Sequence, residues 1–109
     1  MNWNYIKSEE DLEKAVSHSK TSPVLLFKHS TRCSISSMAL SRLERSWDNT
    51  SNVKAYYLDL LEHRPISGKI ESMFGVQHQS PQAIVIKDGV AAYDASHMEI
   101  NAAEILSIK

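Results

Sequence analysis

Three short stretches rich in apolar residues constrain the fold of this chain more than any other feature of its sequence. They cover residues 24–27, 53–60 and 83–86, and each has the length of a β-strand. The first and third are continuous apolar runs, which are typical of strands that are buried on both faces. The second is rich in β-branched and aromatic residues, which also indicates a buried strand. Amphipathic stretches with helical spacing lie between them, so the pattern predicts a sheet with helices on both faces.

Capping and turn residues set the limits of the other elements. Helices are expected over residues 9–18, 34–47, 65–74 and 98–108, with Ser8 as the first N-cap and Gly75 as the C-cap of the third. The Asp88-Gly89 pair predicts a tight hairpin between the third strand and an antiparallel strand over residues 90–93. Residues 3–6 are too short to assign, which leaves four or five strands.

The order of these elements predicts the fold class. A strand, helix, strand unit with buried strands is parallel and right-handed, whereas the hairpin adds antiparallel strands. The result is an α/β fold with a mixed four- or five-stranded sheet and helices on both faces, which is the thioredoxin-like architecture. At 109 residues the chain has room for one core, so residues 1–109 are expected to form a single domain.

Composition excludes several classes of partner. The formal net charge of −1 offers no basic surface for nucleic acid or an acidic membrane. No apolar run approaches the roughly 20 residues of a membrane span, and the N-terminus lacks the pattern of a secretion signal. The single cysteine fits a reducing compartment, so we expect a cytoplasmic protein.

Cys33 is the main candidate for chemistry. It lies between a predicted strand and a predicted helix, where the unpaired N–H groups of the helix N-terminus stabilise an anion. Lys28 and His29 are expected in the same polar loop, and with the neighbouring Arg32 they add positive potential. We therefore expect the pKa of this thiol to be lowered, which favours the thiolate that attacks disulfides.

The alternative is an inert buried thiol, because free cysteine is often fully buried. The polar neighbours Thr31, Arg32 and Ser34 favour a reactive one. Three residues after Cys33 the chain has Ser36, so the motif is C-x-x-S and no internal thiol can resolve a mixed disulfide. Any exchange must be monothiol, and the Ser36 hydroxyl can donate a hydrogen bond to the thiolate but cannot replace a second thiol.

Ser80-Pro81 is the second candidate feature. It precedes a buried strand that is expected to run beside Cys33, and this position favours a cis peptide bond. A cis-proline there would leave the backbone of Ser80 free to pair with an extended substrate. An ordinary trans proline at a strand start is the alternative.

Two other kinds of site are weaker candidates. His29 and Cys33 with His78 or His97 could bind a metal ion, but their spacing matches no ligand pattern, so we expect none. A hydrolytic pair of Cys33 and His29 lacks an evident residue to orient the imidazole.

Three segments of the chain form a recognisable combination: FKHSTRCSIS at residues 27–36, YYLDL at residues 56–60 and FGVQHQSPQA at residues 74–83. Together they resemble the monothiol bacilliredoxin family, also called the YtxJ-like bacillithiol-system proteins, and the similarity extends over residues 3–108. The resemblance implies a thioredoxin-like fold with Cys33 as nucleophile, Ser36 in place of the resolving cysteine and Pro81 as the cis-proline. Many members have proline directly after the cysteine, where this chain has Ser34.

The resemblance also implies an activity. Cys33 would remove bacillithiol, or another low-molecular-weight thiol such as glutathione or coenzyme A, from S-thiolated proteins. That small thiol is then a co-substrate, no bound cofactor is expected, and a second small thiol or a reductase restores Cys33. Lys28, His29, Ser80 and Pro81 are the residues expected to meet the substrate or the small thiol.

Two non-catalytic alternatives remain open. A thioredoxin-like module could bind a peptide at Ser80-Pro81, or hold an iron–sulfur cluster through an external thiol, without turnover. The chain could also be an inactive, stress-associated relative of the family. The exposure and reactivity of Cys33 distinguish these alternatives from an enzyme.

Overall fold

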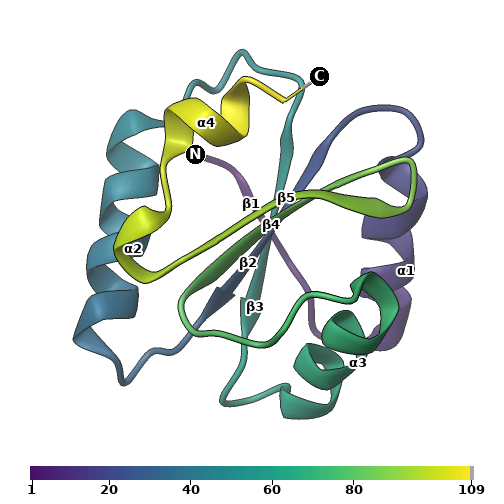
Figure 1. Cartoon of the computed structure of the whole chain (residues 1–109), viewed down its shortest axis with the longest axis horizontal. Helices are drawn as coiled ribbons and strands as arrows, with labels where there is room; N and C mark the ends of the chain where they lie inside the picture. The colour runs from purple at the N-terminus through teal and green to yellow at the C-terminus, as the bar shows by residue number, and fades with distance from the viewer. Residues whose placement is uncertain (109) are drawn as a thin grey trace.

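A computed structural model describes residues 1–108 as one sheet between two layers of helices (Figure 1). The five strands run in the order β1-β3-β2-β4-β5, so the short segment that the sequence left unassigned is an edge strand. The elements are β1 (Trp3–Tyr5), α1 (Glu9–His18), β2 (Val24–His29), α2 (Ser34–Ser46), β3 (Lys54–Asp59), α3 (Arg64–Phe74), β4 (Gln82–Lys87), β5 (Val90–Ser96), a 3₁₀ helix (His97–Glu99) and α4 (Ala102–Leu106).

The sheet is mixed, as predicted, and its pairing positions the site. β1, β3 and β2 are parallel, whereas β4 pairs antiparallel with both β2 and β5. Lys28 of β2 lies opposite Gln82 of β4 in this register. The end of β2, where the chain leaves toward Cys33, is therefore adjacent to the start of β4, which follows Pro81.

Local signals in the sequence correctly set several element boundaries. The Ser8 hydroxyl caps α1 by accepting a hydrogen bond from the Asp11 amide at 3.2 Å. Gly75 ends α3 with a φ of 65°, a left-handed conformation that glycine adopts without a steric penalty. Asp88 and Gly89 both have positive φ in the hairpin, as a two-residue turn of this type requires.

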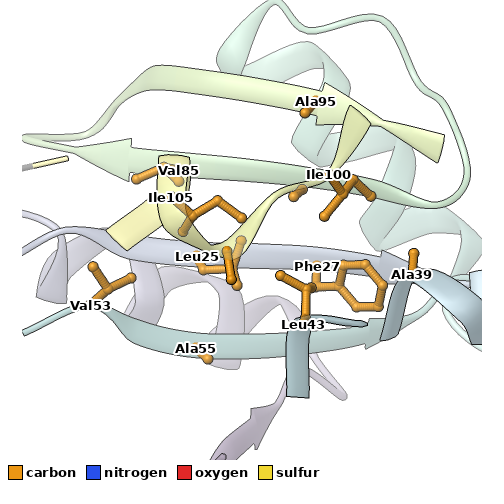
Figure 2. Close-up of a cluster of buried hydrophobic side chains, with 12 residues drawn as sticks. Leu25, Phe27, Ala39, Leu43, Val53, Ala55, Val85, Ala95, Ile100 and Ile105 are labelled. Carbon is orange, nitrogen blue, oxygen red and sulfur yellow. The ribbon is translucent and has the colours of Figure 1, made fainter. Parts of the chain in front are cut away.

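Two hydrophobic clusters fill the space on either side of the sheet. α2 and α4 cover one face and α1 and α3 cover the other (Figure 1). Successive side chains of β2 alternate between them, with Leu25 and Phe27 in one cluster and Val24 and Leu26 in the other. Figure 2 shows the first cluster, in which Leu25 and Phe27 pack with Leu43 of α2 and Ile105 of α4.

The prediction of one continuous helix over residues 98–108 is wrong. A 3₁₀ turn ends at Glu99, and Ile100 is extended with φ −65° and ψ 122° while its side chain packs in the core. Asn101 is the N-cap of α4, and its side chain accepts a hydrogen bond from the Glu104 amide at 3.2 Å. No helix in residues 1–108 combines the length and the apolar character needed to cross a membrane.

Candidate functional site

Cys33 is the N-cap residue of α2, in an extended conformation with φ −106° and ψ 121°. Its amide donates to the Ser30 carbonyl at 3.1 Å, and its carbonyl accepts from the Ser37 amide at 3.1 Å. The side chain is half-buried and makes no capping hydrogen bond. The predicted place of the thiol, at the positive end of a helix, is therefore confirmed.

The surroundings of Cys33 are polar and open. Thr31, Arg32 and Ser34 are all exposed, and so is the apolar side chain of Ile35. The alternative of a thiol sealed in an apolar core is wrong, because Cys33 itself keeps part of its surface in solvent. This turn of the chain is therefore accessible from solvent.

Ser36 occupies the position that a second cysteine would hold, and it is fully buried. Its Oγ accepts a hydrogen bond from the Ser30 amide at 3.0 Å and lies 2.7 Å from Nδ1 of His29. A hydroxyl at this position can in principle donate to the Cys33 thiolate. The structure instead pairs it with His29, and no hydrogen bond to the sulfur of Cys33 is found within residues 1–108.

His29 is held on the α2 face of the sheet with 4% of its surface exposed. Its ring packs 5.9 Å from the ring of Phe27 and 5.4 Å from that of Tyr57, measured between centroids. Burial lowers the pKa of His29, and the carboxylates of Asp59 and Glu44 only partly oppose this effect. The neutral imidazole is thus favoured, and its Nδ1 can accept the Ser36 proton.

Lys28 and His29 do not lie in a loop as predicted, because β2 continues through both residues. The strand alternation turns their side chains to opposite faces of the sheet. Lys28 is fully buried on the α3 side, where its Nζ lies 3.3 Å from the Ser67 carbonyl and 3.2 Å from Nδ1 of His78. Its ammonium therefore contacts interior groups on the α3 side of the sheet, opposite the α2 side on which Ser36 lies.

His78 ties the segment before Ser80-Pro81 to this buried lysine. A charged lysine can only donate, so Nδ1 of His78 accepts, and the Ser67 hydroxyl also lies 3.2 Å from it. The His78 amide donates to the Glu71 carboxylate. Burial lowers the pKa of His78, with a further contribution from the charge of Lys28, while Glu71 opposes both.

The sequence interpretation missed this lysine cluster. Ser67 and Glu71 were not considered, and His78 was considered only as a metal ligand. One signal was available: residues 24–28 alternate, so Val24, Leu26 and Lys28 share one face of the strand. A lysine at that place must bury its ammonium against polar partners from the helix above it.

The Ser80-Pro81 peptide bond is cis, as predicted. Pro81 is buried, and its carbonyl accepts from the His97 amide at 3.0 Å. Neither backbone group of Ser80 has a hydrogen-bond partner within residues 1–108, and Oγ of Ser80 and Oε1 of Gln82 are buried without one. The register places this free backbone beside the C-terminal end of β2. The Cys33 loop leaves the sheet at the same end of this strand.

The weaker alternatives find no geometric support. Within residues 1–108 there is no group of three His, Cys, Asp or Glu side chains placed to hold a metal ion. His29 and His78 are separated by the sheet, since their partners lie on opposite faces. In the proposed hydrolytic pair, Nδ1 of His29 is paired with Ser36 and not with Cys33.

This arrangement, with one accessible thiol and a serine three residues after it, can be compared with known proteins. The model of the family described as monothiol bacilliredoxin BrxC matches residues 4–105. The chain belongs to this family. The resemblance that the sequence motifs indicated is thereby confirmed, and family membership gives the chain a thiol redox role.

Solved structures agree with the fold. One described as a candidate oxidoreductase with a thioredoxin fold shares 27% identity over 94% of this chain and 89% of its own, with a TM-score of 0.79. Thioredoxin from Fasciola hepatica is 18% identical, with 94% and 91% coverage and a TM-score of 0.73. Thioredoxin from Malassezia sympodialis is 16% identical, with 96% and 84% coverage and a TM-score of 0.74. The predicted thioredoxin-like fold is confirmed.

Proposed function

We propose that this bacilliredoxin removes bacillithiol, or a similar small thiol, from S-thiolated proteins by monothiol exchange through Cys33. The observation that carries the proposal is the difference in solvent exposure between the cysteine and the serine of the C-x-x-S motif. Cys33 is accessible at the start of α2, whereas Ser36 is buried and hydrogen-bonded. The chain can thus form one mixed disulfide but cannot close it internally.

The reaction consists of two exchanges. In the first, the Cys33 thiolate attacks the sulfur of the small thiol within the protein mixed disulfide. A new disulfide forms between Cys33 and the small thiol, the old one breaks, and the substrate protein leaves as a thiolate that takes a proton from water. In the second, another small thiolate or a reductase thiolate attacks the small-thiol sulfur of that adduct. It forms a new disulfide with the small thiol, and Cys33 leaves as a thiolate.

Two nearby groups suit these steps. Arg32 is exposed beside Cys33 and would attract the carboxylates of an acidic small thiol. The unpaired backbone of Ser80 would pair with an extended segment of the thiolated protein. Lys28 has no such role in this account, because its ammonium is buried on the other face.

Substitution of the nucleophile tests the proposal. Cys33→Ala should abolish release of bacillithiol from an S-bacillithiolated model protein, measured by the intact mass of that protein over time. Ser37→Ala, on the same helix and exposed, is a matched control for changes to this turn. Full activity in Cys33→Ala would contradict the mechanism.

The identity of the small thiol needs a separate measurement. The wild-type protein is incubated with oxidised bacillithiol, oxidised glutathione or coenzyme A disulfide and then weighed intact. An adduct with only one of these disulfides identifies the co-substrate. Adduct formation without any dethiolation of a protein substrate would favour the non-catalytic binding module.

A further inference from the structure

His29 and Ser36 form a buried polar pair whose protons can be assigned. Ser36 Oγ already accepts from the Ser30 amide, so its own proton needs an acceptor. A buried hydroxyl without an acceptor is costly, and Nδ1 of His29 at 2.7 Å is the partner in place. The arrangement is satisfied when the imidazole is neutral and carries its proton on Nε2.

Ser36 of this pair lies in the first turn of the helix that Cys33 caps. Cys33 is the N-cap and Ser36 is the third residue of the helix, and side chains three apart lie on the same side of a helix. A Ser36 hydroxyl without the His29 acceptor would lie one helical turn from the Cys33 thiolate, which is an anionic acceptor. A hydrogen bond to the thiolate stabilises it and makes it a weaker nucleophile.

We propose that His29 is a positioning residue for the Cys33 reaction, which acts by accepting the Ser36 proton and so keeps that hydroxyl off the thiolate. The Ser30 amide donates to the same Ser36 Oγ, and this hydrogen bond connects the start of the Cys33 loop to the first turn of α2. The inference rests on the proposed function only in taking Cys33 as the reacting thiol.

Three variants separate this role from a merely structural one. His29→Asn keeps an acceptor near the place of Nδ1, His29→Phe removes the acceptor, and His29→Phe/Ser36→Ala removes acceptor and hydroxyl together. Alkylation of Cys33 by iodoacetamide, followed against pH, gives the midpoint of thiolate formation and the limiting rate of the thiolate. This readout requires neither bacillithiol nor a protein substrate.

The expected results differ in direction. In His29→Phe the midpoint should move to lower pH and the limiting rate should fall roughly threefold, because nucleophilicity decreases as the thiolate is stabilised. In His29→Asn and in the double variant both values should stay at or return to those of the wild type. An unchanged His29→Phe, or a double variant that keeps the His29→Phe values, would overturn the proposal.

Ser36→Ala alone keeps the test decisive if His29→Phe does not fold. Because the hydroxyl does not serve the thiolate in the wild type, its removal should leave the midpoint where it is. A midpoint that moves to higher pH would show that Ser36 donates to Cys33 after all, and would refute the role of His29. Failure of dethiolation with an intact His29 effect would refute only the proposed function.

Discussion

The last two residues of β2 anchor the two halves of the site on opposite faces of the sheet. His29 holds the start of α2 through Ser36, and Lys28 holds the segment before Pro81 through His78. Both side chains are buried, and desolvation lowers the pKa of each. One strand end thus places the thiol and the cis-proline relative to each other.

The two anchors, His29 and Lys28, differ in whether their partners have other groups for the same hydrogen bonds. Within residues 1–108 the Ser36 hydroxyl has no acceptor other than His29. Nδ1 of His78, in contrast, has the Ser67 hydroxyl as a second partner, and the Ser67 carbonyl lies inside α3, where a helical hydrogen bond is available to it. We conclude that the histidine is the sole support of its partner, whereas the lysine is one of several.

Removal of His29 is expected to have the largest effect on stability, because Ser36 has no other acceptor in the part of the chain that the structure describes. His29→Phe should reduce the free energy of unfolding by about 1–3 kcal/mol, because it removes the acceptor that the buried Ser36 hydroxyl has in the folded protein. Urea denaturation measures this loss. His29→Phe/Ser36→Ala should regain part of the lost stability, and a double variant that is less stable than His29→Phe would contradict the pairing.

A smaller effect should appear in the pH dependence of stability. The pKa of His29 is lowered in the folded state, so the unfolded chain binds the proton first as pH falls. Stability is therefore full above the ordinary value of 6.5 and decreases below it, until the folded-state pKa is passed. His78 acts in the same direction.

Comparison of variants assigns this pH dependence. His29→Asn should flatten the profile of unfolding free energy between about pH 7 and pH 5 more than His78→Asn does, because His29 is the more deeply buried ring. Thermal unfolding across this range measures both. Equal slopes in the two variants would remove the distinction between the anchors.

Removal of the Lys28 ammonium is expected to have the smallest effect on stability. Lys28→Met keeps the volume of the side chain and removes a buried charge, while its former partners retain other hydrogen bonds. Its free energy of unfolding should stay within about 1 kcal/mol of the wild type. A loss as large as that of His29→Phe would show that Lys28 is equally indispensable.

Local patterns predicted most of the fold. The apolar runs gave three strands, Ser8 and Gly75 marked helix ends, and Asp88-Gly89 marked the hairpin. The last helix was predicted too long because its apolar spacing continues through Ile100, although Asn101 is the residue that caps α4. Side-chain capping decided that boundary against the hydrophobic pattern.

The site was predicted in part. The position of Cys33 follows from the order of strand and helix, which topology fixes. The cis bond at Pro81 was predicted from its place before a buried strand that runs beside the Cys33 loop. The partners of Lys28 and His29 could not be predicted, because polar residues after an apolar run usually indicate a loop. Only the packing of α2 and α3 against the sheet turns these two residues into buried anchors.

A single-turnover mass measurement tests monothiol exchange through Cys33 most directly. The reduced protein is mixed with an equal amount of an S-bacillithiolated protein in the absence of other thiols, and both are weighed intact. We predict that each substrate molecule that loses bacillithiol is matched by one molecule carrying a single bacillithiol on Cys33. Loss from the substrate without that adduct, or with an adduct elsewhere, would contradict the account.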